Sequence, residues 1–459
     1  MTAIPTARPI PWDIYEEHLD EAAFVWGAWE QSLDAANYTL DEVIAGPEER
    51  LLAHLDGLVL GGEPVAQKLL LPALADNDPG KVAAAAWALL QAEDADHLDV
   101  VLEAVATAEK RETRAAIGRA FELCHRTDRV RRLRPRLGAS PPNVQAVIVA
   151  AVVAEVGAAP AAERGAGRGA VPGGELPLAT LLESRHPELL AAALRALRRA
   201  PDPELAPAVE AALGSPYVTV RDAAIEAGVV LGLKAAWRAC NKLVARNAPG
   251  CKLALAVLAL SGEAVDRATV MKRLEVEALR RDAAWALGFT GTLEAVAAAL
   301  ALAGDETIGA VAGDSFATIT GATLAGDLVL VGQTDNTSPP APDDDDEDAP
   351  LPVLRPEDDL PRPDPDHLRA WWAKAQSKAD PPFDPEQRYV GGRLLAGELV
   401  RAAIQTGPTW RRRIWCLELA RRTGQDLDGD TWARHQRARL AAFAIDPRRP
   451  WGAPPPQRG

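Results

Sequence analysis

The 459-residue sequence predicts an all-α protein, a solenoid of about eight stacked helix pairs with a small helical module at its C-terminal end. About one residue in five is alanine, whereas aromatic residues make up only 5%. Alanine has the highest helix propensity, and strands favour branched and aromatic residues. In addition, a small residue followed by a large apolar one recurs at nearly constant spacing, which is typical of stacked repeats.

The first 60 residues are predicted to form an N-terminal helical cap. Apolar residues between Pro11 and Asn37 step alternately by four and three positions, the spacing of a heptad seam. They are Tyr15, Leu19, Ala22, Trp26, Trp29, Leu33 and Ala36. We interpret this helix as a cap, because a solenoid needs its open end covered. The alternative is a helix that dimerises or binds a partner.

Residues 61–330 carry the repeat. Its large residues are Trp87, Ile117, Val147, Leu194, Ile225, Leu255, Trp285 and Phe316, each preceded by Ala except the last, which follows Ser315. Their spacing is 30, 30, 47, 31, 30, 30 and 31 residues. Second helices are predicted at 205–213, 233–244, 265–274 and 293–302. One such pair cannot bury its own apolar face, so neighbouring pairs must stack.

The single 47-residue step contains residues 157–176, which are rich in Gly, Ala and Pro. This composition predicts a flexible loop inserted into the array. A second unusual segment, residues 333–365, contains 11 acidic and 2 basic residues and many prolines. Such a segment cannot bury enough apolar surface to fold, so we predict an acidic, disordered linker.

The segment after the linker, residues 366–450, is predicted to be a distinct helical module with helices at 366–378, 393–406, 410–423 and 430–443. Thr409 and Asp430 are the expected N-caps, and Gly424 is the expected C-cap. Residues 366–459 hold 17 basic and 10 acidic residues and six of the twelve tryptophans. The overall charge of −15 therefore combines an acidic array and linker with a basic tail, and it argues against nucleic-acid binding by the whole chain.

Candidate binding residues lie in this tail. Tryptophans beside an arginine run could hold an acidic protein surface or a nucleic-acid backbone. The residues concerned are Trp371, Trp372, Trp410, Arg411, Arg412, Arg413 and Arg422. A solvated helix face, or a site for the chain's own acidic linker, explains the same pattern without a partner.

No set of residues with the spacing of a catalytic, cofactor or metal site is evident, so we expect no enzyme activity, no cofactor and no metal. Residues 426–430 resemble the start of a calcium loop, but Thr431 and Arg437 stand where such a loop needs Gly and Glu. The four cysteines are scattered, and there is no signal peptide or bilayer-length apolar run. We expect a cytoplasmic protein.

Two strings, residues 315–321 and the Gly407-Pro408 turn with the following 411–420, are similar to those of a proteobacterial family of HEAT-repeat-like proteins. The resemblance covers most of the chain except the insert and the acidic linker. Members of that family are often encoded beside type VI secretion components, which implies an accessory role such as loading an effector. The family has no established catalytic residues to carry over.

These observations predict a non-enzymatic scaffold or adaptor that binds another protein, for example a secretion effector or apparatus component. An enzyme or lyase built on a HEAT scaffold is the first alternative, and it requires a deep cleft lined by ionisable residues. Nucleic-acid binding through the basic module alone is the second.

Overall fold

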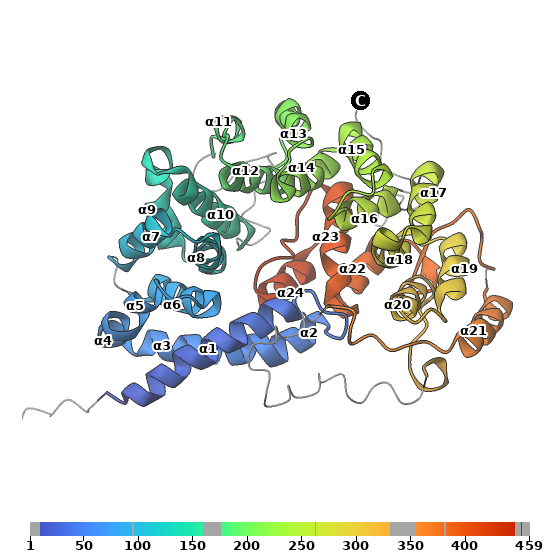
Figure 1. Ribbon diagram of the computed structural model, residues 1–459, viewed down its shortest axis with the longest axis horizontal. Coiled ribbons are helices and arrows are strands. Elements are labelled where there is room, and N and C mark those ends of the chain that lie inside the picture. The colour runs from blue at the N-terminus through green and yellow to red at the C-terminus, as the bar shows by residue number, and fades with distance from the viewer. Residues whose placement is uncertain are drawn as a thin grey trace, which may run out of the picture.

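The computed structural model describes residues 10–93, 96–158, 176–261, 263–330, 355–380, 382–445 and 451. The chain forms an arc of helix pairs arranged in two layers, with the C-terminal helices inside the arc (Figure 1). The predicted all-α solenoid of HEAT-like pairs is thereby confirmed. Most of the predicted insert and the acidic run of the linker lie outside the described residues.

The inner layer consists of one helix from each pair. These helices are α1 (Trp12–Ser32), α6 (Pro79–Gln91), α8 (Arg111–Leu123), α10 (Pro142–Ala158), α12 (Pro187–Arg199), α14 (Val218–Leu231), α16 (Lys252–Ser261), α18 (Glu277–Thr290) and α20 (Gly309–Thr320). Each packs against the next around the arc. All eight small–large pairs of the repeat lie on these helices and are buried. The repeat register therefore marks the inner layer.

The outer layer covers the convex side. It consists of α3 (Glu49–Leu60), α7 (His97–Thr107), α9 (Thr127–Leu133), α11 (Leu178–Leu182), α13 (Ala206–Ala212), α15 (Lys234–Ala245), α17 (Ala264–Lys272) and α19 (Leu293–Leu302). The four second helices predicted from the sequence correspond to α13, α15, α17 and α19, with α13 and α17 extended by 3-10 turns (Pro203–Leu205 and Arg273–Glu275).

Short elements complete the N-terminal end. They are α2 (Leu40–Val43), α4 (Gly62–Val65), α5 (Leu71–Ala73) and two π-helical turns, Ile44–Glu48 and Ala66–Leu70. The first helix ends at Ser32 rather than at the predicted Asn37, and the chain turns there. Helix α1 packs on α3 and α6, as a cap on the first repeat would.

The C-terminal module contains α21 (Pro365–Lys378), the two-residue strands β1 (Tyr389–Val390) and β2 (Arg393–Leu394), α22 (Gly397–Thr406), α23 (Thr409–Thr423) and α24 (Ala433–Ala442). The two strands pair antiparallel, with Tyr389 opposite Leu394. The prediction of a helix from residue 393 was wrong, because residues 393–394 pair in this hairpin and α22 begins at Gly397.

Two of the predicted helix boundaries also need correction. Thr409 is the first residue of α23 rather than its cap, and its hydroxyl group instead contacts the end of α1, 2.7 Å from the Ser32 carbonyl oxygen. Helix α24 begins at Ala433, so Asp430 is not its N-cap. The predicted C-cap at Gly424 has the left-handed φ of 74° that favours glycine.

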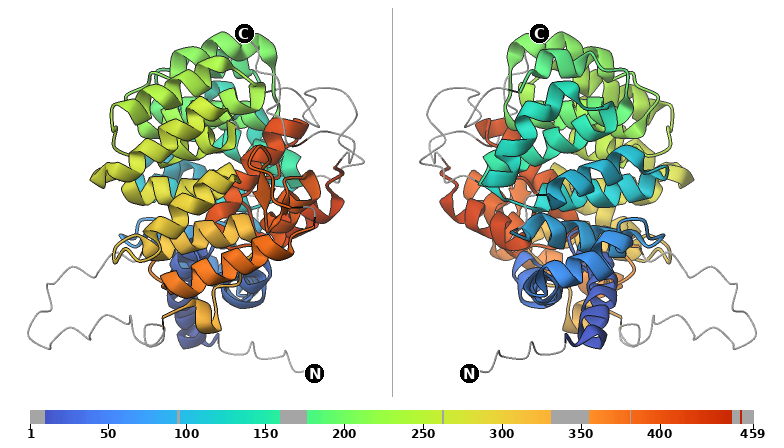
Figure 2. Two further views of the ribbon diagram at one scale, coloured as in Figure 1. Left: turned by 90° about the vertical axis from the view of Figure 1, so that its right-hand side faces the viewer. Right: turned by 90° about the vertical axis from the view of Figure 1, so that its left-hand side faces the viewer.

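The module is not a separate body on a tether. It fills the concave side of the arc, and Figure 2 shows that it lies toward one face of the ring of inner helices. It contacts both ends of the array: α23 reaches the end of α1, and β1 packs on α20. The module therefore closes the arc.

The described end of the predicted linker is ordered as well. The Leu330 amide donates to the Arg362 carbonyl oxygen at 3.0 Å, and the Asp364 amide donates to the Leu328 carbonyl oxygen at 2.9 Å. The Glu357 carboxylate accepts from Arg281 at 2.8 Å. The prediction of disorder up to residue 365 was therefore wrong for residues 355–365, because the array supplies backbone and charged partners for them.

Among the described residues, no helix combines the length and the apolar character needed to cross a lipid bilayer.

Candidate functional site

The tryptophans of the module pack on the aromatic side chains of the array. The rings of Trp29 and Trp432 lie 4.7 Å apart, and those of Phe289 and Trp415 lie 5.0 Å apart. Trp410 approaches the repeat residue Trp285 at 6.2 Å. Trp371 and Trp372 both contact Phe316, at 5.8 and 6.0 Å. These rings bury apolar area and hold the module in the arc.

Arg411 is directed into the last repeats. Its Nε atom donates to the Asp314 carboxylate at 2.6 Å, and its Nη atoms donate to the Ser315 hydroxyl and the Trp285 carbonyl oxygen, both at 2.8 Å. Gly288 makes room for it, since a Cβ atom at that position would meet the Arg411 Nη1 atom at 2.5 Å. Thus Ser315, the one non-alanine residue in the small position of the repeat, is an acceptor for the module.

The neighbouring arginines are also engaged within the chain. Arg412 donates to the Leu33 carbonyl oxygen at 3.0 Å and to the side chain of Gln436. Arg422 donates to the buried Glu418 at 2.5 Å.

The predicted partner-binding surface must therefore be corrected. Trp372, Trp410, Arg411, Arg412 and Arg422 are buried, Trp371 is half-buried, and only Arg413 is exposed. The chemistry assigned to a partner is used on the chain's own array. The described acidic groups that meet these arginines, such as Asp314 and Glu418, come from the repeats and the module.

Arg388 is an anchor that the sequence analysis missed. It lies just before β1, and its Nε atom donates to the Thr290 carbonyl oxygen at 2.7 Å. Its Nη atoms reach the carbonyl oxygens of Phe289 at 2.8 Å and Leu260 at 3.3 Å. These carbonyls are at the C-terminal ends of α18 and α16, where a cation is favoured. Burial lowers the pKa of Arg388 to about 10.

Glu48 is a second missed anchor, and it lies in the first π-helical turn. Its buried carboxylate accepts from the Trp29 indole at 3.1 Å and from the backbone amides of Ala433 and Arg434, the latter at 2.9 Å. A side chain from the start of the array therefore caps α24, which is the role predicted for Asp430.

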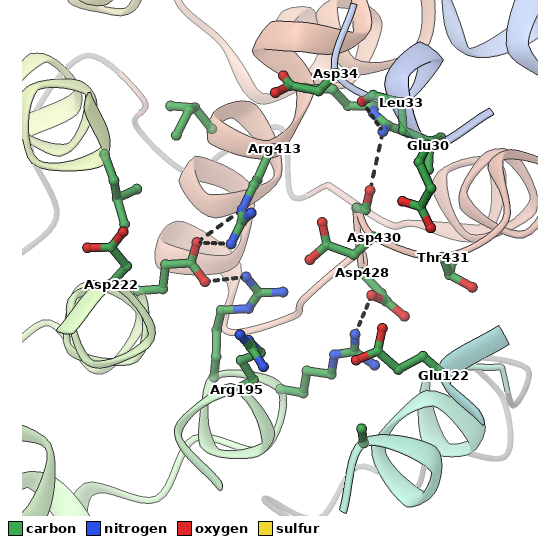
Figure 3. Close-up of a pocket in the computed structure, with 18 of the residues that line it drawn as sticks. Glu30, Leu33, Asp34, Glu122, Arg195, Asp222, Arg413, Asp428, Asp430 and Thr431 are labelled. Atoms are coloured by element: carbon green, nitrogen blue, oxygen red, sulfur yellow. Dashed lines mark hydrogen bonds and ion pairs between the residues drawn. The ribbon is translucent and has the colours of Figure 1, made fainter. Parts of the chain in front are cut away.

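A cavity of about 680 Å³ remains between the inner helices and the module (Figure 3). Its charged lining comes from both parts of the chain. The cations are Arg119, Arg195, Arg198, Arg199, Lys252, Arg412 and Arg413, and the acidic residues are Glu30, Asp34, Glu122, Asp222, Glu226, Asp428 and Asp430. Apolar side chains such as Val153, Val218 and Ile414 lie between them. Volumes of 300–1,000 Å³ are usual for ligand sites.

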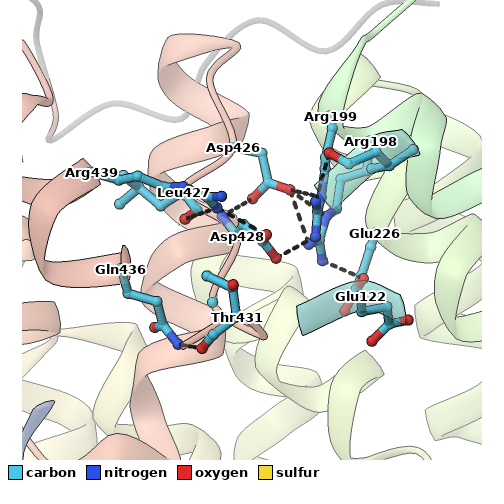
Figure 4. A network of polar contacts seen from close by, with 12 residues as sticks. Glu122, Arg198, Arg199, Glu226, Asp426, Leu427, Asp428, Thr431, Gln436 and Arg439 are labelled. Carbon is cyan, nitrogen blue, oxygen red and sulfur yellow. Dashed lines mark hydrogen bonds and ion pairs between the residues drawn. The ribbon is translucent and has the colours of Figure 1, made fainter. Parts of the chain in front are cut away.

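Many of these charges are paired, and some of the pairs join the array to the module. Glu226 of α14 accepts from Arg198 at 2.7 Å and from Arg413 at 2.9 Å. Asp426 accepts from Arg198 at 3.0 Å, and Asp428 from Arg439 at 2.9 Å. Figure 4 shows this network between α12 and the loop before α24. The carboxylates of the apparent calcium loop thus face guanidinium groups, and the described residues contain no group of three potential ligands placed for a metal.

Two carboxyl groups in the cavity have opposite pKa shifts. Burial raises the pKa of Asp34, and Lys252 and Arg413 oppose this only in part. Burial acts in the same direction on Asp430, but Arg413, Arg198 and two further arginines outweigh it and hold the pKa of Asp430 well below its usual range. Asp34 is thus the more readily protonated of the two, and Asp430 is an anion.

Two histidines meet where the module contacts the second repeat, between α8 and α9. The rings of His125 and His435 lie 4.5 Å apart, and the His125 Nε2 atom is 2.9 Å from the Thr431 hydroxyl. Burial, helped by the neighbouring cations, lowers the pKa of His125 to about 3 and that of His435 to about 4.

Comparison with known proteins finds structural similarity at low sequence identity. No protein-family model matches the chain, and no curated protein is significantly similar to it in sequence. Among solved structures, YibA of Escherichia coli is 12% identical, with a TM-score of 0.34 over 63% of this chain and 99% of that one. Human deoxyhypusine hydroxylase in complex with glycerol is 18% identical, with a TM-score of 0.26 over 61% and 98%.

Proposed function

We propose that the chain is a non-enzymatic scaffold that binds a segment of another protein in the cavity between its array and its module. The observation that carries this proposal is the lining itself: charged groups of both signs are held on helices that are locked by buried contacts. A preorganised site of this kind binds at a low entropic cost.

The identity of the partner rests on the resemblance noted above. That resemblance makes type VI effectors and apparatus components the first proteins to examine as partners in a cytoplasmic accessory role. The basic module is a poor candidate for nucleic acid, because its arginine run is directed into the array.

A capture experiment from the native host tests the scaffold. Deleting residues 333–459 would uncover the aromatic inner face, so a point variant is the cleaner comparison. Arg195 is exposed and lines the cavity, and Arg238 is exposed on the outer helix α15. We expect the native chain and Arg238→Gln to retain the same protein and Arg195→Gln to lose it. Equal capture by all three chains would contradict the proposal.

A second candidate, an enzyme on the same scaffold, is favoured by the opposite pKa shifts of Asp34 and Asp430. Two carboxyl groups whose pKa values are shifted in opposite directions in one cavity are an arrangement suited to a general acid and a general base. The test is to incubate the full chain with a small-molecule extract of the host. Consumption of a metabolite by the native chain but not by Asp34→Asn would favour the enzyme, and unchanged extracts would favour the scaffold.

A further inference from the structure

The cavity contains four charged side chains that the surrounding network leaves available. Among the described residues, Arg195 and Lys252 have no carboxylate within ion-pair distance, and Asp34 and Asp430 have no cation within that distance. Other charged residues of the lining already have partners within the chain. For example, Arg119 pairs with Glu30 at 2.7 Å, and Arg198 pairs with Glu226 at 2.7 Å. A ligand can therefore engage these four groups without breaking an existing pair.

The available groups are of two kinds. Arg195 and Lys252 can only donate hydrogen bonds, and the ionised Asp34 and Asp430 can only accept them. Arg195 is on α12 and Lys252 begins α16, whereas Asp34 follows α1 and Asp430 precedes α24. Donors and acceptors are thus presented from four separate elements around one cavity.

Lys252 illustrates how firmly these groups are placed. Its ammonium group lies 4.5 Å from the centre of the Trp285 ring and 5.9 Å from that of Trp410. Cation–π contacts of this kind hold the charge in position and leave its hydrogen-bond donors for a ligand. Since Lys252 is also the cation that most strongly opposes the raised pKa of Asp34, the two side chains act on the same part of the cavity.

We infer that the cavity binds an extended peptide segment of zero net charge that carries both an acidic and a basic side chain. Its acidic side chains would meet Arg195 and Lys252, and its basic side chains would meet Asp34 and Asp430. A segment whose charges were all of one sign would pair with two of these groups and be repelled by the other two. The inference rests on the proposed scaffold function and specifies the chemistry of the bound segment.

A peptide fits the lining better than a free amino acid does. The cavity of about 680 Å³ is large, and its apolar residues Val153, Val218 and Ile414 lie among the charges, as the aliphatic parts of a peptide require. Peptide amides both donate and accept, so the backbone can also bridge groups of opposite kind.

The test uses the full chain and three fluorescein-labelled octapeptides in which alanine alternates with charged residues. One contains lysine and glutamate equally, one only glutamate and one only lysine. Fluorescence polarisation should show that the mixed peptide binds at least tenfold more tightly than either single-sign peptide. Loss of one charge-assisted hydrogen bond corresponds to a roughly ten- to hundredfold weaker Kd.

Variants separate specific recognition from general charge attraction. Arg195→Gln should weaken the mixed peptide and improve the relative binding of the all-lysine peptide. Asp34→Asn and Asp430→Asn should each shift the preference toward the all-glutamate peptide. Both variants are measured because Asp430→Asn also removes a charge from the arginines around it. Arg238→Gln is the matched control and should bind as the native chain does. Thermal melting checks that each variant is folded.

Equal binding of the three peptides, no binding at about 1 mM, or an Arg195→Gln variant indistinguishable from the native chain would overturn this inference. These outcomes are distinct from failure of the scaffold proposal, which is decided by capture from the host. If Arg195-dependent capture persists while the charge preference is absent, the scaffold function stands and the peptide chemistry is wrong.

Discussion

The Arg411 guanidinium of α23 and the Asp314 carboxylate of α20 form a buried ion pair, with 2.6 Å between Nε and Oδ2, although the two residues are 97 positions apart in the chain. Burial raises the pKa of Asp314 and lowers that of Arg411, in each case more than the partner restores it. Desolvation thus costs more than the attraction returns, so the pair fixes the position of α23 rather than adding net stability.

Removing one member of this pair should therefore be much more harmful than removing both. Asp314→Ala leaves a guanidinium buried without its counter-ion, and we expect a loss of about 3–5 kcal/mol in the free energy of unfolding. Arg411→Met combined with Asp314→Leu should recover most of that loss. Urea unfolding followed by tryptophan fluorescence measures both. A double variant no more stable than Asp314→Ala alone would contradict this expectation and show that the ion pair itself is stabilising.

Even a conservative replacement of Arg388 should lower the stability of the fold. Its fork spans the ends of two helices through the carbonyl oxygens of Leu260, Phe289 and Thr290, whereas an ammonium group is a single point of charge. We expect Arg388→Lys and Arg388→Met each to cost about 3 kcal/mol or more, as loss of several charge-assisted bonds to buried carbonyls would. Thermal unfolding provides the measurement. Full retention of stability by the lysine variant would show that the forked guanidinium group is not required. The exposed Arg393→Lys is the control.

The cap that Glu48 provides can be tested at single amides. In Glu48→Gln the side chain keeps one acceptor oxygen but loses its charge, so the start of α24 should open more easily. Hydrogen exchange at the amides of Ala433 and Arg434 should accelerate by about tenfold, corresponding to about 1.4 kcal/mol. Amides in the middle of α15, far from Glu48, should be unchanged. If they accelerate equally, the variant has destabilised the whole chain and the local cap is not the cause.

The histidine contact predicts a loss of stability in mild acid. Unfolded imidazoles titrate near pH 6.5, whereas His125 and His435 titrate at about 3 and 4 in the fold. The unfolded chain therefore binds more protons as the pH falls below about 6.5, and the loss grows until the folded values are reached. Between pH 6.5 and 5 each histidine should cost about 1.5 kcal/mol.

Denaturant unfolding at several pH values checks this expectation. His435→Phe keeps an aromatic contact but cannot titrate, so it should remove about half or more of the slope between pH 6.5 and 5. His367, whose side chain is 61% exposed on α21, is the matched control. An unchanged slope in His435→Phe would mean that other groups govern the acid sensitivity.

The repeats could be predicted because their signal is local. A small residue beside a large one, such as Ala224 before Ile225, meets the same packing problem in every repeat, so the spacing alone located the inner helices. The position of the module could not be predicted in this way. Trp410 and Arg411 have the same local pattern whether they bind a partner or the chain's own array, and only long-range contacts distinguish the two.

The sequence also contains a weaker signal of the cavity, in the residue that follows the large apolar one in each repeat. In six repeats the residue after the large apolar one is uncharged, but Arg195 follows Leu194 and Glu226 follows Ile225. Because this position faces the inside of the arc in α12 and α14, the two charged exceptions mark the part of the array that lines the cavity. Pairing Glu226 with Arg413 still requires the fold, since the two residues are 187 positions apart in the chain.

The bond between Glu48 and the amide of Ala433 joins residues 385 positions apart. Ribosomes add roughly 5–20 residues per second, so the beginning of the array waits about 20–80 s for the segment that completes it. During that interval Trp29 and Trp87 lack the Trp432 ring that covers them in the finished protein. The nascent chain therefore presents aromatic surface to the cell throughout most of its synthesis, and it should depend on chaperones until its last hundred residues emerge.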